Sequence, residues 1–108
     1  MHNTHNTAFF DDVLKASYAE PVVVMFHASW CGPCKSMKPL VERLATDIGF
    51  TLVGVDAGTE RQLAASESVR AVPTLIVYKD GKAVGSPSAG GKTETALRTF
   101  LATAGVWA

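Results

Sequence analysis

Two cysteines in the segment Trp30-Cys31-Gly32-Pro33-Cys34 have the type and spacing for covalent chemistry. Two intervening residues bring the sulfurs within disulfide distance, and Pro33 restrains the loop, so that closing it has a small entropic cost. Such a pair interconverts between a dithiol and a disulfide. The segment therefore predicts a reversible two-electron couple.

The location of the two cysteines predicts different roles for them. They fall between an apolar, β-branched run at 22–28, which predicts a buried central strand, and a helical pattern from Cys34 to Ile48 that ends at Gly49. At a helix N-terminus, Cys31 faces unpaired backbone N–H groups and the positive end of the helix dipole. We expect its pKa to lie below the free value of about 8.5. Cys34, one turn further, is expected to stay protonated and less accessible.

Other uses of two cysteines fit less well. A structural disulfide across so short a loop would constrain the unfolded chain little. Zinc fingers need further ligands at set spacings, which the three histidines, His2, His5 and His27, do not supply, so no metal is expected. Covalent haem attachment requires His after Cys34, where Lys35 stands. The segment 90–93, Gly-Gly-Lys-Thr, lacks the earlier glycine of a phosphate-binding loop, and a strand-to-helix turn is favoured there.

The hydrophobic pattern alternates between helical and extended periods, as is typical of an α/β protein. A capping box of Thr59 and Gln62 predicts the start of a short third helix. Asp80-Gly81 predicts a tight antiparallel hairpin. The expected helices are 8–18, 34–48, 59–68 and one through Leu97 to Ala104, and the expected strands are 22–28, 51–56, 74–79 and 82–88.

Composition narrows the class of protein. The 108 residues, 47% of them hydrophobic, suffice for a single domain over 1–108. Ten basic residues balance ten acidic ones, so nothing favours a nucleic-acid or anionic-membrane partner. No apolar run approaches the roughly 20 residues of a membrane span, and the N-terminus has no secretory pattern. A cytoplasmic, thiol-reducing location is expected.

The chain resembles the thioredoxin family over roughly residues 8–104. The resemblance rests on Trp30-Cys31-Gly32-Pro33-Cys34-Lys35, on Pro39 in the following helix, on Val72-Pro73-Thr74, and on Asp80-Gly81 and Gly90. It implies a thioredoxin fold, with a central mixed β-sheet of four to five strands flanked by four helices. It also implies a thiol-disulfide oxidoreductase that reduces protein disulfides.

The resemblance further assigns roles to single residues. Cys31 would attack the substrate disulfide and Cys34 would resolve the mixed disulfide. Pro73 would follow a cis peptide bond beside the cysteines, and the backbone of Val72 would pair with substrate. The surrounding apolar surface would comprise Trp30, Gly32, Pro33, Val55 and Gly90. No cofactor is implied, the protein would act as a monomer, and a flavin- and NADPH-dependent thioredoxin reductase would restore the dithiol.

The chain departs from the family pattern close to the cysteines. Met25 and Leu52 replace a buried Asp and its Lys partner, so the usual proton acceptor for Cys34 is missing. His27 replaces a Trp, whereas its usual Asp partner is retained as Asp56, which suggests a contact between His27 and Asp56. The first strand would come from the polar segment 2–7, and this edge strand is expected to be short or disordered. A non-catalytic subunit that docks a partner through the same surface is the alternative function.

Overall fold

A computed structural model describes residues 2–4 and 9–106 of the chain. They form a five-stranded mixed sheet in the order β1-β3-β2-β4-β5, in which β3 is parallel to β1 and β2, and β4 is antiparallel to β2 and β5. The strands are β1 (His2–Thr4), β2 (Val22–His27), β3 (Thr51–Asp56), β4 (Thr74–Lys79) and β5 (Lys82–Ala89). The helices are α1 (Phe9–Ala19), α2 (Gly32–Ile48), α3 (Arg61–Ser66) and α4 (Glu94–Thr103).

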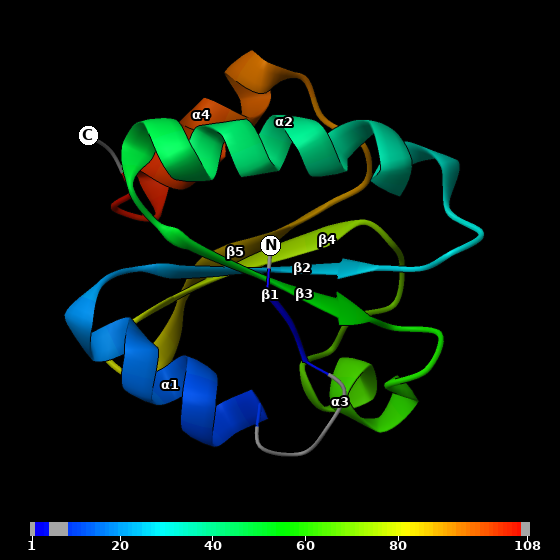
Figure 1. The fold of residues 1–108 in the computed structure, drawn as a ribbon, viewed down its shortest axis with the longest axis horizontal. Helices are drawn as coiled ribbons and strands as arrows, with labels where there is room; N and C mark the ends of the chain where they lie inside the picture. The colour runs from blue at the N-terminus through cyan, green and yellow to red at the C-terminus, as the bar shows by residue number, and fades with distance from the viewer. Residues whose placement is uncertain (1, 5–8, 107–108) are drawn as a thin grey trace.

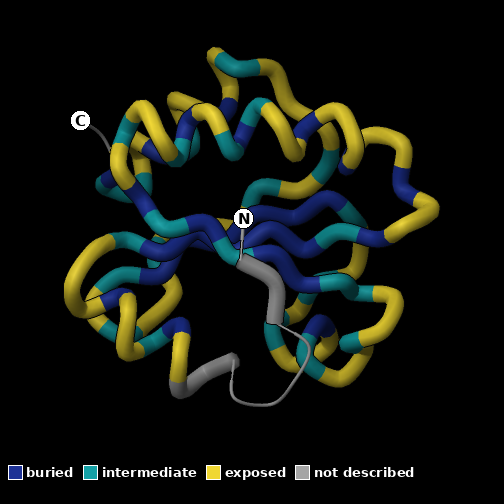
Figure 2. The backbone as a smooth tube through the Cα atoms, viewed as in Figure 1, coloured by how far each residue is buried: buried dark blue, intermediate teal, exposed yellow. Residues whose placement is uncertain are grey.

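The helices lie on both faces of the sheet, α2 and α4 on one and α1 and α3 on the other (Figure 1). Successive side chains of a strand point to opposite faces. Accordingly, Val23 and Met25 of β2 join the apolar cluster beneath α2 and α4, whereas Val24 and Phe26 join the cluster toward α1 and α3. Central strands are therefore buried on both sides, as Figure 2 shows by their colour.

The predicted fold class and the order of the elements are confirmed. The strand expected within 2–7 is present as β1, and positions 5–8 lie outside the described residues. Helix α2 begins at Gly32, two residues before the predicted start, because Cys31 already acts as its N-cap. The predicted capping box of α3 is wrong. Thr59 does not cap that helix, which begins at Arg61 after Glu60.

The turn between β4 and β5 is fastened to the end of α1. Asp80 and Gly81 have φ angles of 52° and 81°, the left-handed conformation that a tight hairpin requires. The carbonyl oxygen of Ser17 accepts from the Asp80 amide at 3.0 Å, and its Oγ accepts from the Gly81 amide at 2.8 Å. A Cβ at Gly81 would lie 2.3 Å from the hydroxyl of Tyr18, an exposed side chain that can move aside, so the positive φ is what favours glycine there.

Strand β5 is an irregular edge strand. Its register against β4 shifts between Leu75 and Val77, Gly85 has a φ of 70°, and Pro87 lacks a backbone N–H. Most of its residues are exposed. The strand thus closes the sheet on one side and contributes little to the core.

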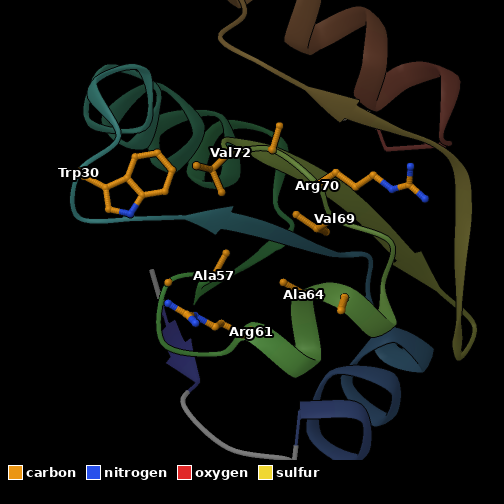
Figure 3. Close-up of a pocket in the computed structure, with 10 residues that line it drawn as sticks. Trp30, Ala57, Arg61, Ala64, Val69, Arg70 and Val72 are labelled. Atoms are coloured by element: carbon orange, nitrogen blue, oxygen red, sulfur yellow. The ribbon is translucent and has the colours of Figure 1, made fainter.

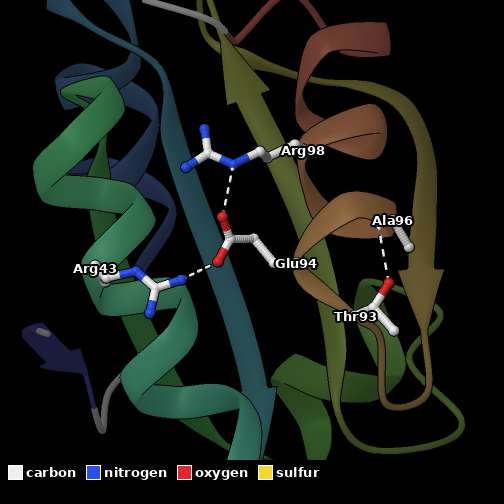
Figure 4. Close-up of polar contacts among 5 residues, drawn as sticks. All are labelled: Arg43, Thr93, Glu94, Ala96 and Arg98. Atoms are coloured by element: carbon white, nitrogen blue, oxygen red, sulfur yellow. Dashed lines mark hydrogen bonds and ion pairs between the residues drawn. The ribbon is translucent and has the colours of Figure 1, made fainter.

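A polar contact joins the two helices above the sheet. Glu94, in the first turn of α4, pairs with Arg43 of α2 and with Arg98 one turn along its own helix, the latter at 3.0 Å (Figure 4). Thr93 caps α4 by accepting from the Ala96 amide at 3.2 Å. These side chains are about half exposed, so each pair contributes at most about 1 kcal/mol. The pair with Arg43 links the first turn of α4 to the helix that carries the cysteines.

Candidate active site

The two cysteines lie at the N-terminus of α2 and are joined by a disulfide, with a Cα–Cα distance of 5.3 Å. Cys31 is the N-cap, and its Sγ accepts a hydrogen bond from the backbone amide of Cys34 at 3.1 Å. Gly32 and Pro33 form the first helical positions, where Pro is tolerated because its missing N–H has no helical partner. One sulfur therefore sits where the helix presents its free donors.

The expected difference in exposure between the cysteines is absent. Cys31 is 3% exposed and Cys34 is 4% exposed, and both belong to the apolar cluster beneath α2. In the disulfide-bonded form the two cysteines are therefore buried to the same extent. In this oxidised form, Gly32 and Pro33 between them carry the exposed surface.

Two segments remote in sequence meet the cysteine loop. The Val72–Pro73 peptide bond is cis, and the carbonyl oxygen of Pro73 accepts from the Gly90 amide at 2.8 Å. A Cβ built on Gly91 would lie 3.5 Å from Cβ of Pro33. The turn between β5 and α4 and the segment before β4 therefore border the disulfide, with Val72 half-buried and Pro73 buried.

Trp30 is the most exposed aromatic residue among the described side chains, at 75%. It borders a shallow cavity of about 330 Å³ that extends from Val72 across the turn after β3 to helix α3. Figure 3 shows Trp30 and Val72 at one side of this cavity, with Ala57 and Arg61 below them. The predicted substrate surface thus continues away from the cysteines into a shallow groove.

The structure corrects one residue of that predicted surface and adds others. Val55 is completely buried, in the cluster toward α1 and α3, so it has no area to offer a partner. Its side chain belongs to the cluster on the opposite face of the sheet from the cysteines. Arg61 and Arg70, which sequence reasoning did not select, line the cavity instead. The sequence gives little indication that these two arginines belong to a site, since single arginines in polar segments are common.

The positions at which the chain departs from the family pattern lie on the face of the sheet that carries the cysteines. Met25 is 1% exposed and Leu52 is 5% exposed, and both pack in one cluster with Cys34. His27 and Asp56 are register neighbours on β2 and β3. Oδ1 of Asp56 accepts from the amides of Gly58, at 2.8 Å, and Thr59, at 3.3 Å. The suggested contact between His27 and Asp56 stays a prediction.

A second, smaller cavity lies beside Cys34. It measures about 190 Å³ and is lined by Met25, His27, Ala28, Ser29, Cys34, Lys35 and Lys38. Within the part of the chain that the structure describes, no three side chains of the His, Cys, Asp or Glu type come together to hold a metal ion. None of the described helices has the length and hydrophobicity that a membrane span requires.

A disulfide at the N-terminus of the first helix after the central strand, beside an exposed Trp and a cis-proline segment, defines a site for thiol-disulfide exchange. Comparison with known proteins agrees. The thioredoxin family model matches residues 1–103. Thioredoxin from Mycobacterium bovis is 40% identical over 73% of this chain and 68% of its own, and that from Mycoplasmoides gallisepticum is 37% identical over 76% and 81%.

Solved structures show the same relationship. The crystal structure of Fasciola hepatica thioredoxin superimposes with a TM-score of 0.86, at 34% identity, and covers 96% of this chain and 99% of that one. This chain belongs to the thioredoxin family. Family members act on protein disulfides, and the Cys31–Cys34 pair gives this chain the redox-active disulfide of a thiol-disulfide oxidoreductase.

Proposed function

We propose that this protein reduces disulfides in other proteins, with Cys31 as the nucleophile and Cys34 as the resolving cysteine. The observation that carries the assignment is the N-cap position of Cys31, whose Sγ accepts the Cys34 amide at 3.1 Å. A thiolate on Cys31 would be stabilised by that donor and by the helix dipole, and a low thiol pKa makes an effective nucleophile at neutral pH. Cys34 lies within the first turn, where the sulfur receives no comparable amide.

The reaction consists of two sulfur exchanges. The Cys31 thiolate attacks one sulfur of the substrate disulfide, forms a mixed disulfide and releases the first substrate thiolate. Cys34 then attacks Cys31, which forms the intramolecular disulfide and releases the second substrate thiolate. Two electrons pass to the substrate, and only sulfur atoms carry them, so no bound cofactor takes part.

Residues around the loop would hold the substrate chain. Trp30, Gly32 and Pro33 offer exposed apolar area, while Val72 and Pro73 present backbone next to them, with Gly90 bonded to Pro73. An extended peptide could pair with the backbone at Val72 as a short added strand. Such binding uses area more than depth, which suits varied protein substrates.

The catalytic cycle requires a source of electrons. We propose that an NADPH-dependent thioredoxin reductase returns the Cys31–Cys34 disulfide to the dithiol. The chain would work as a single domain over 1–108 and as a monomer. Its location would be the cytoplasm, because a disulfide couple with a Gly-Pro loop suits a reductant in a thiol-reducing compartment.

Turnover of insulin disulfides with dithiothreitol as reductant tests the proposed function. Wild type should accelerate insulin precipitation, and Cys31→Ser should reduce the rate to that of dithiothreitol alone. The alternative is a docking subunit that uses the exposed Trp30 surface without chemistry. If wild type gives no acceleration while its dithiol forms readily, the docking function replaces the proposed one.

A further inference from the structure

His27 lies on the same face of the sheet as the cysteines. Residues alternate along β2, so Met25 and His27 point toward α2 while Val24 and Phe26 point toward α1 and α3. His27 is partly buried, and its Nε2 atom is fully buried. A buried imidazole nitrogen therefore sits at the end of the strand that leads into the cysteine loop.

The cavity of about 190 Å³ is lined by both His27 and Cys34. A water molecule occupies about 30 Å³ in the liquid, so this space is large enough for a proton to pass through water between the two groups. Met25 is 1% exposed, lines the cavity and also belongs to the apolar cluster beneath α2. The cavity therefore connects a thiol with an imidazole and has one apolar wall.

The resolving step demands a proton acceptor at this place. Cys34 must lose its proton before it can attack, and at 4% exposure it has little direct access to solvent. Three other side chains that line the cavity can ionise: His27 and the cations Lys35 and Lys38. An ammonium group offers only donors, whereas a neutral imidazole has one ring nitrogen that can accept a proton.

We propose that His27 accepts the proton of Cys34 during resolution of the mixed disulfide, an inference that rests on the proposed function. The Cys34 S–H bond breaks as the proton moves through water in the cavity to the imidazole ring of His27. The Cys34 thiolate then bonds to Sγ of Cys31, and the bond from Cys31 to the substrate sulfur breaks. The substrate sulfur leaves with the electron pair, and the imidazolium returns its proton to solvent or to that thiolate.

The charged groups around His27 affect how readily its imidazole accepts the proton of Cys34. Lys35 and Lys38 approach from α2 and oppose formation of the imidazolium, while Asp56 lies beside His27 in register on β3 and favours it. One acidic group and two basic groups thus lie around the imidazole. Cys34 is the remaining titratable group that faces the cavity from α2.

Ellman's reagent separates the two exchanges. When it reacts with the reduced protein, attack by Cys31 releases one thionitrobenzoate at a rate proportional to reagent. Resolution by Cys34 releases the second at a rate independent of reagent. In wild type this second rate should rise as His27 becomes neutral and then level off. In His27→Phe it should fall about 100-fold at pH 7 and rise about tenfold per pH unit without that plateau.

Three further variants control for changes in the cavity. His27→Gln keeps polarity but removes the base, and it should behave like His27→Phe. Ser29→Ala alters the lining of the same cavity without removing a base and should keep the wild-type profile. Adding Met25→Asp to His27→Phe places a carboxylate on the same face and should restore most of the rate at pH 7. If both His27 variants keep the wild-type rate and profile, the inference is overturned.

A measurement on unaltered protein avoids any dependence on the folding of the variants. In the reduced wild type, the NMR shifts of the His27 ring should show a second inflection at the pH where Cys34 ionises, and Cys34→Ser should lack it. A single inflection in both proteins would overturn the inference. Failure of the proposed function looks different, because the wild type itself would then show no concentration-independent second release.

Discussion

The two faces of the sheet are built alike but have different contents. Toward α1 and α3, Val24, Phe26 and Tyr78 pack in an apolar cluster whose charged contact is made by the Tyr78 hydroxyl to Glu67. Toward α2 and α4, an apolar cluster of similar residues includes Cys31 and Cys34 at its edge. Successive residues of one strand therefore belong to different clusters, one that contains the redox-active cysteines and one that contains none. Substitutions on the two faces should have separable effects.

The largest effect is expected on the cysteine face. Cys34→Ser should accumulate stable mixed disulfides through Cys31, because the second exchange has lost its nucleophile, whereas Cys31→Ser should accumulate none. Steady-state turnover should fall to background in both. Non-reducing electrophoresis of each variant after incubation with an oxidised protein substrate measures the trapped species. Equal trapping by the two variants would contradict the assignment of roles.

Truncation on the opposite face should affect stability and not chemistry. Phe26 is fully buried in the cluster toward α1 and α3, and Phe26→Ala should lower the free energy of unfolding by about 3 to 5 kcal/mol. Urea unfolding of the oxidised protein measures this loss. The alkylation rate of Cys31, measured below the urea transition, should stay within about twofold of wild type. A large change in that rate would show that the two faces are coupled.

A carboxylate introduced on the cysteine face should affect both properties. Met25→Asp should lower the free energy of unfolding by about 1 to 3 kcal/mol, because a polar group replaces a packed side chain and Leu52 gives it no charge partner. The same change supplies a second acceptor for the Cys34 proton, so resolution should depend less on pH below neutrality. Urea unfolding and the Ellman's assay test the two effects. Unchanged stability would contradict the expected cost and would mean that the introduced carboxylate is hydrated through the cavity.

The smallest effect concerns the buried phenol. Burial, and after it the hydrogen bond and charge of Glu67, raise the pKa of Tyr78 above its ordinary value of about 10. Folding thus favours the neutral phenol, and this stabilisation is complete below pH 10 and is lost as the pH rises above it. Tyr78→Phe should cost about 1 kcal/mol at neutral pH and should weaken the loss of stability above pH 10. An identical alkaline profile in both proteins would contradict this role.

The sequence predicted the elements well where the periodicity was long. Strands β2 to β4 and helix α2 follow from runs of apolar residues, and the Asp80-Gly81 turn follows from its backbone requirement. The start of α3 did not. Thr59 and Gln62 matched a capping box, but the Thr59 hydroxyl donates to the Asp56 carbonyl oxygen and its amide to the Asp56 carboxylate. A local turn competed with the helix for the same donors.

The sequence predicted those features of the site that depend on residues adjacent in the chain. The position of Cys31 at the start of α2 follows from adjacent elements, whereas the burial of Val55 and the cavity shared by His27 and Cys34 depend on packing between segments. Arg61 and Arg70 join the groove because α3 and the segment before β4 converge beside Trp30. Such convergence cannot be derived from spacing along the chain.

The irregular edge strand β5 has a consequence for how the protein behaves at high concentration. A regular exposed edge offers a row of free N–H and C=O groups that a second chain can extend, which begins aggregation. Here Pro87 removes one donor, the twist at Gly85 and the register shift interrupt the row, and Lys82 adds charge at its start. The outer edge of the sheet is thus unsuited to pairing with a second copy of this chain.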